Sequence, residues 1–468
     1  MSSRRILIGA AVIAMAWAIT RAAVQSITID EAVTYNIFVF NRRYLWYAAN
    51  NHILNSTLMY GLTKVFGLSQ FTVRLPALIG AAFYIAAAYR LCRLLGTSVF
   101  VQLTVFVCLV FNPFIFDYLV AARGYGLALG FLIWAMVYQV WRRGNLVAAC
   151  AVSSLCAGLS VDANFSFTVV TLTAMTAILL CAWYQRPNQW FRLLATCILP
   201  GAAVIAIVSG YALLHRHPGE LIYGASSLGE TFGSVMEASL FQSRLDFLAP
   251  LVFPLVGITG LAWLCCSATR MTPLGWAAAA IFAVTVAIHW TAFREFGLLL
   301  PKDRTASYFF PLFMILAGVL AAAPSASRLG RYLRSSFIGS LVVMAVYFLF
   351  CLRLTYFKEW QWDADVQKTY SLLTCLNRNH QVTRVAASWS YRGPLNFYQI
   401  AQPTSMREID ENFDPQQTQI YVVDTLHMPE AMHGKDLKIF YRSPATDLVL
   451  AASPPLAETY SAGTCLRL

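Results

Sequence analysis

The sequence predicts an α-helical polytopic membrane protein with about 11 transmembrane helices, interfacial helices in its first outer loop, and a small C-terminal α/β domain. Of the 468 residues, 58% are hydrophobic and only 12% are charged, and the mean hydropathy is +0.59. This composition excludes an ordinary soluble domain of the same length. Apolar runs of roughly 18 to 20 residues recur up to residue 354, each long enough to cross a hydrocarbon core of roughly 30 Å. From residue 355 onward the composition changes, because the last 114 residues hold 12 of the 22 acidic side chains.

The apolar runs define a membrane domain over residues 1–354, followed by an α/β domain over residues 355–468. We place the spans at 6–24, 74–95, 98–116, 124–141, 145–161, 165–183, 193–213, 247–266, 274–291, 306–323 and 336–354. Residues 25–73 then form the first outer loop, and residues 215–246 form the longest later one. The first run also has features of a cleaved signal peptide, since Arg4 and Arg5 precede a short apolar core. The many spans that follow favour an uncleaved anchor.

The charges orient these spans. One set of loops carries the arginines and is therefore cytoplasmic by the positive-inside rule: Arg4, Arg5, Arg90, Arg93, Arg142, Arg143, Arg186, Arg192, Arg270, Arg328, Arg331 and Arg334. All acidic residues before residue 355 fall on the other side: Asp30, Glu31, Asp117, Asp162, Glu220, Glu230, Glu237, Asp246, Glu295 and Asp303. An odd number of spans predicts a cytoplasmic N-terminus and an exoplasmic or periplasmic C-terminal domain in the plasma (inner) membrane. The net charge of +12 comes from the inner arginines and indicates no nucleic-acid partner.

The first outer loop carries two adjacent carboxylates, Asp30 and Glu31, shortly after the first span. Acidic groups this close to a membrane segment are costly unless they have a partner or a function. A structural alternative is that Asp30 caps a helix beginning at Glu31. Residues 31–40 and 54–66 are expected to form short helices at the interface, too short to span and suited to cover a cavity that opens outward.

Two later outer segments carry cations. Arg123 follows the outer end of the third span, where it is either a snorkelling arginine paired with Asp117 or a phosphate-binding group. Lys302 and Arg304 precede Tyr308, and their alternative role is a salt-bridged surface loop. A further outer turn holds Asp162, for which a turn residue is the alternative to a ligand.

The C-terminal domain is expected to contain an amphipathic helix at residues 363–377 and strands at 383–389, 419–424, 438–441 and 448–452. Cys375 and Cys465 are the only cysteines beyond residue 355, and an exoplasmic domain would pair them as a disulfide. Two buried free thiols are the alternative. The other cysteines lie mostly in apolar runs, with no spacing that suggests a zinc site.

Several segments resemble, in order and spacing, the GT-C superfamily of polyprenyl-phosphate-sugar-dependent glycosyltransferases. The matching parts are Asp30-Glu31 after the first span, Asn51-His52-Ile53-Leu54, Phe66-Gly67 and Arg74-Leu75-Pro76. They are similar to the first outer loop of the branch that holds aminoarabinose transferases and protein O-mannosyltransferases. Ile53 and Leu54 stand where members usually carry prolines, and Gly124 replaces the proline of an Ala-Arg-Pro-Tyr type element.

The resemblance implies a hexosyl or pentosyl transferase with catalytic groups Asp30 and Glu31. It implies donor-phosphate binding by Arg123, Lys302, Arg304 and His52, and substrate binding by Asn55, Tyr125, Asp162 and Tyr308. No cofactor is certain. A divalent metal remains open, because some members hold one on acidic ligands and Asp30, Glu31 and Asp117 would be the ligands here.

The expected reaction moves a sugar from a polyprenyl-phosphate donor to an acceptor hydroxyl on the outer face of the membrane, with inversion and with Asp30 as general base. The acceptor would be an envelope glycan, a lipid or a protein, and membrane lipids are the remaining partners. A transporter or flippase of lipid-linked sugars is the first alternative, although it predicts ionisable groups near the midplane and inverted repeats. A non-catalytic subunit on the same scaffold is the second.

Overall fold

The computed structural model describes residues 3–141, 145–215, 223–240, 246–267, 271–414, 416–426, 428–429, 433, 435–462 and 465. Four residues of the charge argument lie outside these ranges: Arg142, Arg143, Glu220 and Arg270. The chain forms two compact units. Unit 1 comprises Met1–Thr20, Leu45–Leu58 and Arg74–Leu352; unit 2 comprises Arg21–Tyr44, Met59–Val73 and Arg353–Leu468. Much of the first outer loop, expected as part of the membrane domain, therefore groups with the C-terminal region.

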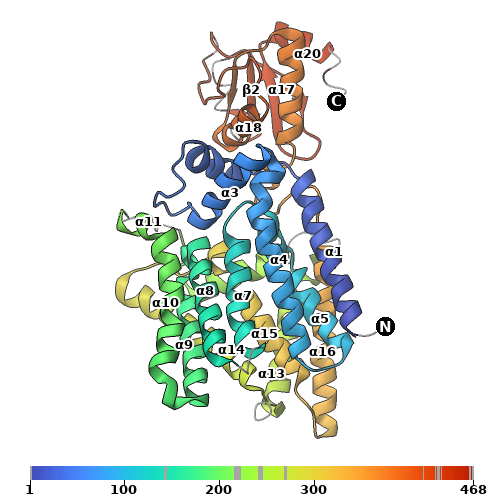
Figure 1. The fold of residues 1–468 in the computed structure, drawn as a ribbon. Helices are drawn as coiled ribbons and strands as arrows, with labels where there is room; N and C mark the ends of the chain where they lie inside the picture. The colour runs from blue at the N-terminus through green and yellow to red at the C-terminus, as the bar shows by residue number, and fades with distance from the viewer. Residues whose placement is uncertain are drawn as a thin grey trace. The chain divides into compact units, whose positions relative to one another are not determined.

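Long helices account for most of the membrane part of the chain (Figure 1). They are α1 (Ser3–Val24), α4 (Gln70–Leu94), α5 (Val99–Val110), α6 (Pro113–Val120), α7 (Tyr125–Trp141), α8 (Leu146–Ala163), α9 (Thr168–Gln185), α10 (Trp190–Val208), α13 (Ala249–Ser267), α14 (Pro273–Phe296), α15 (Phe309–Ala322) and α16 (Arg328–Phe350). Nine described helices are long and apolar enough to cross a membrane. The predicted spans at 98–116 and 124–141 correspond to the pair α5–α6 and to the shorter apolar helix α7. The predicted helical membrane fold is confirmed, and within the described ranges the eleven predicted spans correspond to these nine helices, the α5–α6 pair and α7.

The third predicted span is broken for a local reason. Helices α5 and α6 meet at a bend of 59°. Between them Asn112 accepts a hydrogen bond from the backbone N–H of Ile115 (3.0 Å), and Pro113 occupies the first position of α6. An N-cap side chain followed by proline starts a new helix and does not continue the old one.

Close backbone approach holds α8 against α10 (Figure 1). A Cβ atom at Gly158 would lie 2.6 Å from the carbonyl oxygen of Gly201, so no larger residue fits there without displacement. The hydroxyl of Ser154 accepts a hydrogen bond from the Gly201 N–H at 2.9 Å. Small residues and a hydroxyl group are the usual means of packing helices where lipid supplies no hydrophobic drive between them.

The short helices of the first outer loop are present with shifted boundaries. They are α2 (Ile29–Val33), continued by the π-helix η1 (Thr34–Phe40), and α3 (Ile53–Phe66). The alternative that Asp30 caps the first of them is wrong. Thr28 is the N-cap, because its side chain accepts from the Glu31 N–H while the Glu31 side chain accepts from the Thr28 N–H. This reciprocal capping box leaves Asp30 inside the first turn.

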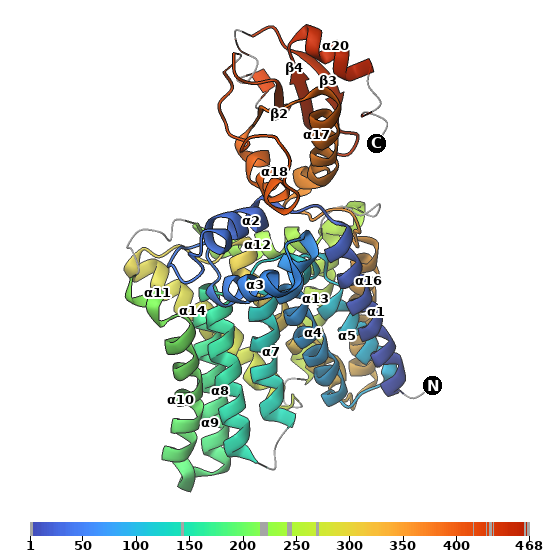
Figure 2. The same ribbon diagram turned by 45° about the horizontal axis from the view of Figure 1, so that its top comes forward.

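Unit 2 contains a four-stranded sheet in the order β1-β2-β4-β3. Its strands are β1 (Val385–Ala387), β2 (Ile420–Asp424), β3 (Lys438–Arg442) and β4 (Leu448–Ala452), with β1 parallel to β2 and the other pairs antiparallel. Helices α17 (Val366–His380), α18 (Trp389–Ala401) and α20 (Pro454–Ala462) accompany the sheet (Figure 2). Cys375 and Cys465 form a disulfide, which confirms the predicted pair.

Candidate active site

Buried polar side chains gather at one end of the unit 1 helices. Arg123 precedes α7 and is 2% exposed, and Asp162 lies in the last turn of α8. His52 and Asn55 join them, because the Asn55 amide donates to the carbonyl of Ala122 (3.2 Å). The ring of His52 lies 5.1 Å from that of Tyr125 in an edge-on arrangement. The structure thus brings five of the predicted site residues, Arg123, Asp162, His52, Asn55 and Tyr125, into one buried polar region.

Gly124 makes this close assembly sterically accessible. A Cβ atom at this position would overlap the carbonyl oxygen of Ala163 and lie 2.8 Å from the Cβ of His52. The glycine that replaces the proline of related sequences is therefore explained by contact between three chain segments. It lets the end of α8 approach the start of α7.

His52 is held neutral in this region. Burial lowers the pKa of its imidazole well below the ordinary value, and the positive charges of Arg123 and Arg304 lower it further, while a hydrogen bond to the backbone of Ala163 opposes them. The Nε2 atom is buried and has no hydrogen-bond partner among the described residues. An imidazole that donates from Nδ1 to a carbonyl presents Nε2 as an acceptor. His52 therefore suits a hydroxyl group better than a phosphate oxygen.

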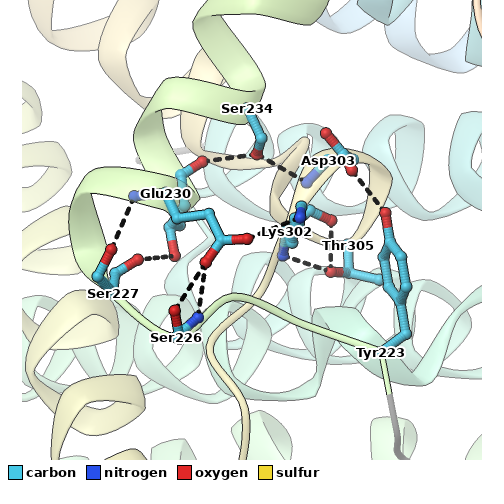
Figure 3. A network of polar contacts seen from close by, with 9 residues as sticks. Tyr223, Ser226, Ser227, Glu230, Ser234, Lys302, Asp303 and Thr305 are labelled. Carbon is cyan, nitrogen blue, oxygen red and sulfur yellow. Dashed lines mark hydrogen bonds and ion pairs between the residues drawn. The ribbon is translucent and has the colours of Figure 1, made fainter.

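Lys302 belongs to a polar network that joins helix α12 (Leu228–Ser239) to the loop before α15 (Figure 3). Its ammonium group lies 2.7 Å from Glu230 Oε1. That pair lowers the pKa of Glu230 to about 2, aided by hydrogen bonds from Ser226, and raises the pKa of Lys302. Both groups are therefore ionised at neutral pH. The Lys302 side chain therefore forms a salt bridge within its loop region, as the alternative role for this residue predicted.

The same network shapes the backbone that carries Arg304. The Asp303 N–H donates to Ser234 Oγ (2.9 Å), and Tyr223 donates to Asp303 Oδ2 (2.5 Å) (Figure 3). Asp303 has a φ of 46°, a left-handed conformation that costs about 1–3 kcal/mol and persists only where the surrounding structure imposes it. The guanidinium of Arg304 lies 5.6 Å from the centre of the Tyr223 ring, a cation–π contact. Arg304 is thus held by its neighbours while its charge acts on His52.

Two other predicted ligands are engaged inside unit 1. Tyr308 is fully buried, and its hydroxyl lies 2.8 Å from His289 Nε2. Asp162 accepts a hydrogen bond from Ser209 (2.6 Å) through Oδ1, whereas Oδ2 has no partner among the described residues. The Tyr308 hydroxyl is therefore hydrogen-bonded inside unit 1, whereas one oxygen of Asp162 faces no donor among the described residues.

The two predicted catalytic carboxylates differ in their surroundings within unit 2. Glu31 is fully buried, and its Oε2 accepts from the Thr28 N–H at 2.9 Å. Asp30 is half-buried on the same turn. The capping box accounts for Glu31, so Asp30 is the carboxylate of the pair whose position the cap does not explain.

A metal site finds no support in the donor set. Among the described residues, no group of three or more His, Cys, Asp or Glu side chains is placed to hold a metal ion. The carboxylate of Glu31 is already used by the helix cap.

A cavity of about 760 Å³ opens at the other end of the unit 1 helices. It is lined by the end of α4 (Leu94), the end of α9 (Tyr184), the start of α14 (Pro273) and the end of α15 (Val319), and its walls are mainly apolar. Arg123 and Asp162 lie at the opposite helix ends, so this cavity suits a hydrocarbon chain and not a phosphate group.

Sequence reasoning missed Glu230, Ser209 and Asp363 as partners of the site residues. Asp363 is fully buried and accepts from the Ile29 N–H, 334 positions earlier in the chain. Glu230 shares its loop with Glu220 and Glu237, so nothing in the sequence singles it out, and no local pattern marks Ser209 or Asp363.

No protein-family model matches this sequence, and none of the curated proteins matches it either. Solved structures do. The crystal structure of ArnT from Cupriavidus metallidurans bound to undecaprenyl phosphate is 11% identical, with a TM-score of 0.54 over 96% of this chain and 98% of that one. Its apo form gives a TM-score of 0.53 at 10% identity over the same shares of the two chains. An oligosaccharyltransferase of Archaeoglobus fulgidus is 14% identical, with a TM-score of 0.42 over 96% of this chain and 74% of that one. The chain therefore has the fold of ArnT, and the predicted fold class, a helical membrane domain with a small C-terminal α/β domain, is confirmed.

Proposed function

We propose that this protein is a membrane glycosyltransferase that takes a sugar from a polyprenyl-phosphate donor and transfers it to an acceptor hydroxyl. The observation that carries the proposal is the match to ArnT, a protein crystallised with undecaprenyl phosphate, over nearly the whole of both chains. A shared fold by itself does not fix function. The chemical argument comes from two cations, Arg123 and Arg304, whose charges both act on His52, since a departing phosphate needs positive charge at fixed positions.

The proposed step forms one bond and breaks another at the anomeric carbon of the donor sugar. The acceptor oxygen attacks that carbon from the face opposite the phosphate, which gives inversion. The bond between the carbon and the phosphate oxygen breaks, and the bonding electrons leave with polyprenyl phosphate. The acceptor hydroxyl loses its proton to Asp30, the general base of the proposal.

The growing charge on the departing phosphate requires cations at fixed positions. Arg123 and Arg304 are the proposed ligands, because a guanidinium binds phosphate oxygens in pairs and stays charged when buried. Lys302 adds positive charge, but its ammonium is bound by Glu230 and it acts mainly on the loop. His52, Asn55 and Asp162 would bind sugar hydroxyls, since each carries a buried polar atom without a described partner.

We further propose that the reaction occurs on the outer face of the plasma (inner) membrane. The arginine and acid asymmetry supports a cytoplasmic N-terminus. The disulfide between Cys375 and Cys465 supports an oxidising compartment for the C-terminal domain. The sugar, hexose or pentose, and the acceptor, an envelope glycan, lipid or protein, are to be identified by experiment.

The direct test is mass spectrometry of the purified protein in lipid nanodiscs. It would be incubated with a panel of undecaprenyl-phosphate-linked hexoses and pentoses together with an extract of envelope glycans and lipids. The proposal predicts that at least one donor is consumed, with release of undecaprenyl phosphate and a matching mass gain in an acceptor. If no donor in the panel is consumed and the bound donor lipids are recovered unchanged, the non-catalytic alternative is favoured.

A further inference from the structure

The segment that carries Asp30 is bound within unit 2 by residues of the C-terminal region (Figure 2). The Gln25 side chain donates to the carbonyl of Tyr356 at 2.9 Å. The Ile27 N–H donates to the Tyr398 hydroxyl at 3.0 Å. The segment is thus hydrogen-bonded to residues more than 300 positions away in the sequence.

Apolar packing supports the same attachment. Helix α2 lies against α18, where a Cβ atom at Gly393 would meet Val33 at 3.9 Å and Ala32 at 4.0 Å. The ring of Tyr35 packs edge-on against Phe397 at 5.5 Å. The Asn36 side chain closes the contact by donating to the Gly393 carbonyl at 3.0 Å.

Asp363 completes the first turn of α2. The first N–H groups of a helix have no partner inside it. The Thr28 side chain accepts one from Glu31, and Asp363 Oδ2 accepts the N–H of Ile29 at 2.7 Å. Asp363 is 1% exposed, and its Oδ1 has no partner among the described residues. Asp30 lies between the two anchored residues, so its main chain is fixed on both sides.

We propose that Asp363 is a positioning residue for Asp30: by holding the Ile29 N–H it sets the direction of the turn from which the Asp30 carboxylate reaches its substrate. The inference rests on the proposed function, in which Asp30 is the general base. It assigns the C-terminal domain a part in the reaction, since a positioning contact of the catalytic turn comes from it. A displacement of about 1 Å at a reacting group can cost roughly a hundredfold in rate.

Asparagine should replace Asp363 without loss. Burial raises the pKa of the Asp363 carboxyl well above its ordinary value, and the nearby charges of Glu31 and Asp30 raise it further, although the Ile29 hydrogen bond lowers it. A protonated carboxyl and an amide each offer one carbonyl oxygen as an acceptor. Asp363→Asn therefore keeps the contact, whereas Asp363→Ala removes it.

The experiment compares Asp363→Ala and Asp363→Asn in the full-length protein in nanodiscs. Asn377→Ala is the matched control, because the described hydrogen bonds of the Asn377 side chain go to Val382 (2.7 Å) and Ser405 (2.8 Å) inside unit 2 and not to α2. Three quantities are measured: amide hydrogen exchange of the peptide covering residues 26–36, binding of undecaprenyl phosphate, and the kcat and KM for the undecaprenyl-phosphate sugar that the parent consumes. Melting temperatures identify variants that simply unfold.

The expected result is selective. In Asp363→Ala the exchange of residues 26–36 rises and kcat falls by about tenfold or more, while KM and lipid binding change by less than about twofold. Asp363→Asn matches the parent, and Asn377→Ala changes neither local exchange nor kcat. Parental kcat in a folded Asp363→Ala protein would overturn the proposal, as would unchanged exchange of the segment. Asp30→Asn is assayed in parallel; parental turnover there would overturn the proposed base, whereas the exchange data would still report on the anchor.

Discussion

Arg123 has 2% of its surface exposed, and its charge acts on the buried ring of His52. We expect Arg123→Gln to weaken binding of undecaprenyl phosphate by about 1–3 kcal/mol, the scale of a lost hydrogen bond between charged groups. Arg304→Gln should act in the same direction. Lys302→Gln is the control, because Glu230 already binds its ammonium and the effect should be smaller. Titration of the lipid into nanodiscs, followed by native mass spectrometry, measures the affinity of all three variants. If both arginine variants bind the lipid as tightly as the parent, the phosphate lies elsewhere.

The contribution of Asp363 to the stability of the folded protein depends on pH with a definite sign. Its pKa is raised in the folded protein, so the folded state retains a proton that the unfolded chain releases near its ordinary pKa of about 4. The contribution of this group to stability is therefore fully present below pH 4 and declines as pH rises toward the raised value. Asparagine cannot ionise. The melting temperature of Asp363→Asn relative to the parent should accordingly increase between about pH 4 and pH 7.

The difference in melting temperature between Asp363→Asn and the parent is measured for unit 2 by proteolysis during heating. Fragments of residues 353–468 are quantified at each temperature. A constant difference across the pH range would mean that Asp363 titrates as it does in an unfolded chain. Asp365→Asn is the control, since its carboxylate is bound by the Ser443 hydroxyl and lies on the same segment.

Single residues were predictable from the sequence where their signal is local. The acid beside a membrane span marked Asp30, and cations at the outer span ends marked Arg123 and Arg304. The partners of these residues were not predictable, because Asp363 and Ile29 meet only through the tertiary fold. The cap of α2 shows the same limit on a smaller scale, since Thr28 and Asp30 are both good capping residues and only backbone geometry selects Thr28.

At the scale of elements, the contact between the start of α7 and the end of α8 depends on Gly124, which has no side chain. Gly124→Ala should push Ala163 and His52 away from the start of α7, because the added Cβ overlaps main-chain atoms that cannot rotate aside. Both stability and lipid binding should decrease. Gly61→Ala is a matched control, since a Cβ atom there meets nothing within 4 Å. The comparison requires melting temperatures and undecaprenyl phosphate affinities; parental values for Gly124→Ala would show that the two segments are free to separate.

Helices and strands were predictable from the sequence where their hydrophobic pattern is long and regular. Within the part of the chain that the structure describes, long apolar runs predicted the membrane helices, and alternating or continuous apolar residues predicted the four strands. Helix α18 was missed because Gly393 and Pro394 lie within it, and that pair ordinarily indicates a turn. Its packing against α2 and α17 outweighs those local preferences.

For the whole molecule, the orientation in the membrane is the prediction on which the outer-face reaction depends. Single cysteines at Gly229 and Leu298 should react with an impermeant thiol reagent in intact cells, whereas cysteines at Asn188 and Leu329 should not. The background protein keeps the Cys375–Cys465 disulfide and has its other cysteines replaced. Mass tagging after lysis provides the control for reactivity. The reversed labelling pattern would place the polar end of unit 1 in the cytoplasm and refute an outer-face reaction.

The most direct test of the account is the rate at which the full-length protein releases undecaprenyl phosphate from its sugar donor, compared between the parent and Asp30→Asn. Asparagine is nearly isosteric and leaves the Thr28–Glu31 cap intact, but it cannot accept the proton of the acceptor hydroxyl. At saturating donor we expect turnover to fall by roughly 10²–10⁴, the usual share of a general base, with lipid affinity and melting temperature unchanged. A folded Asp30→Asn protein that releases undecaprenyl phosphate at the parental rate would contradict the account.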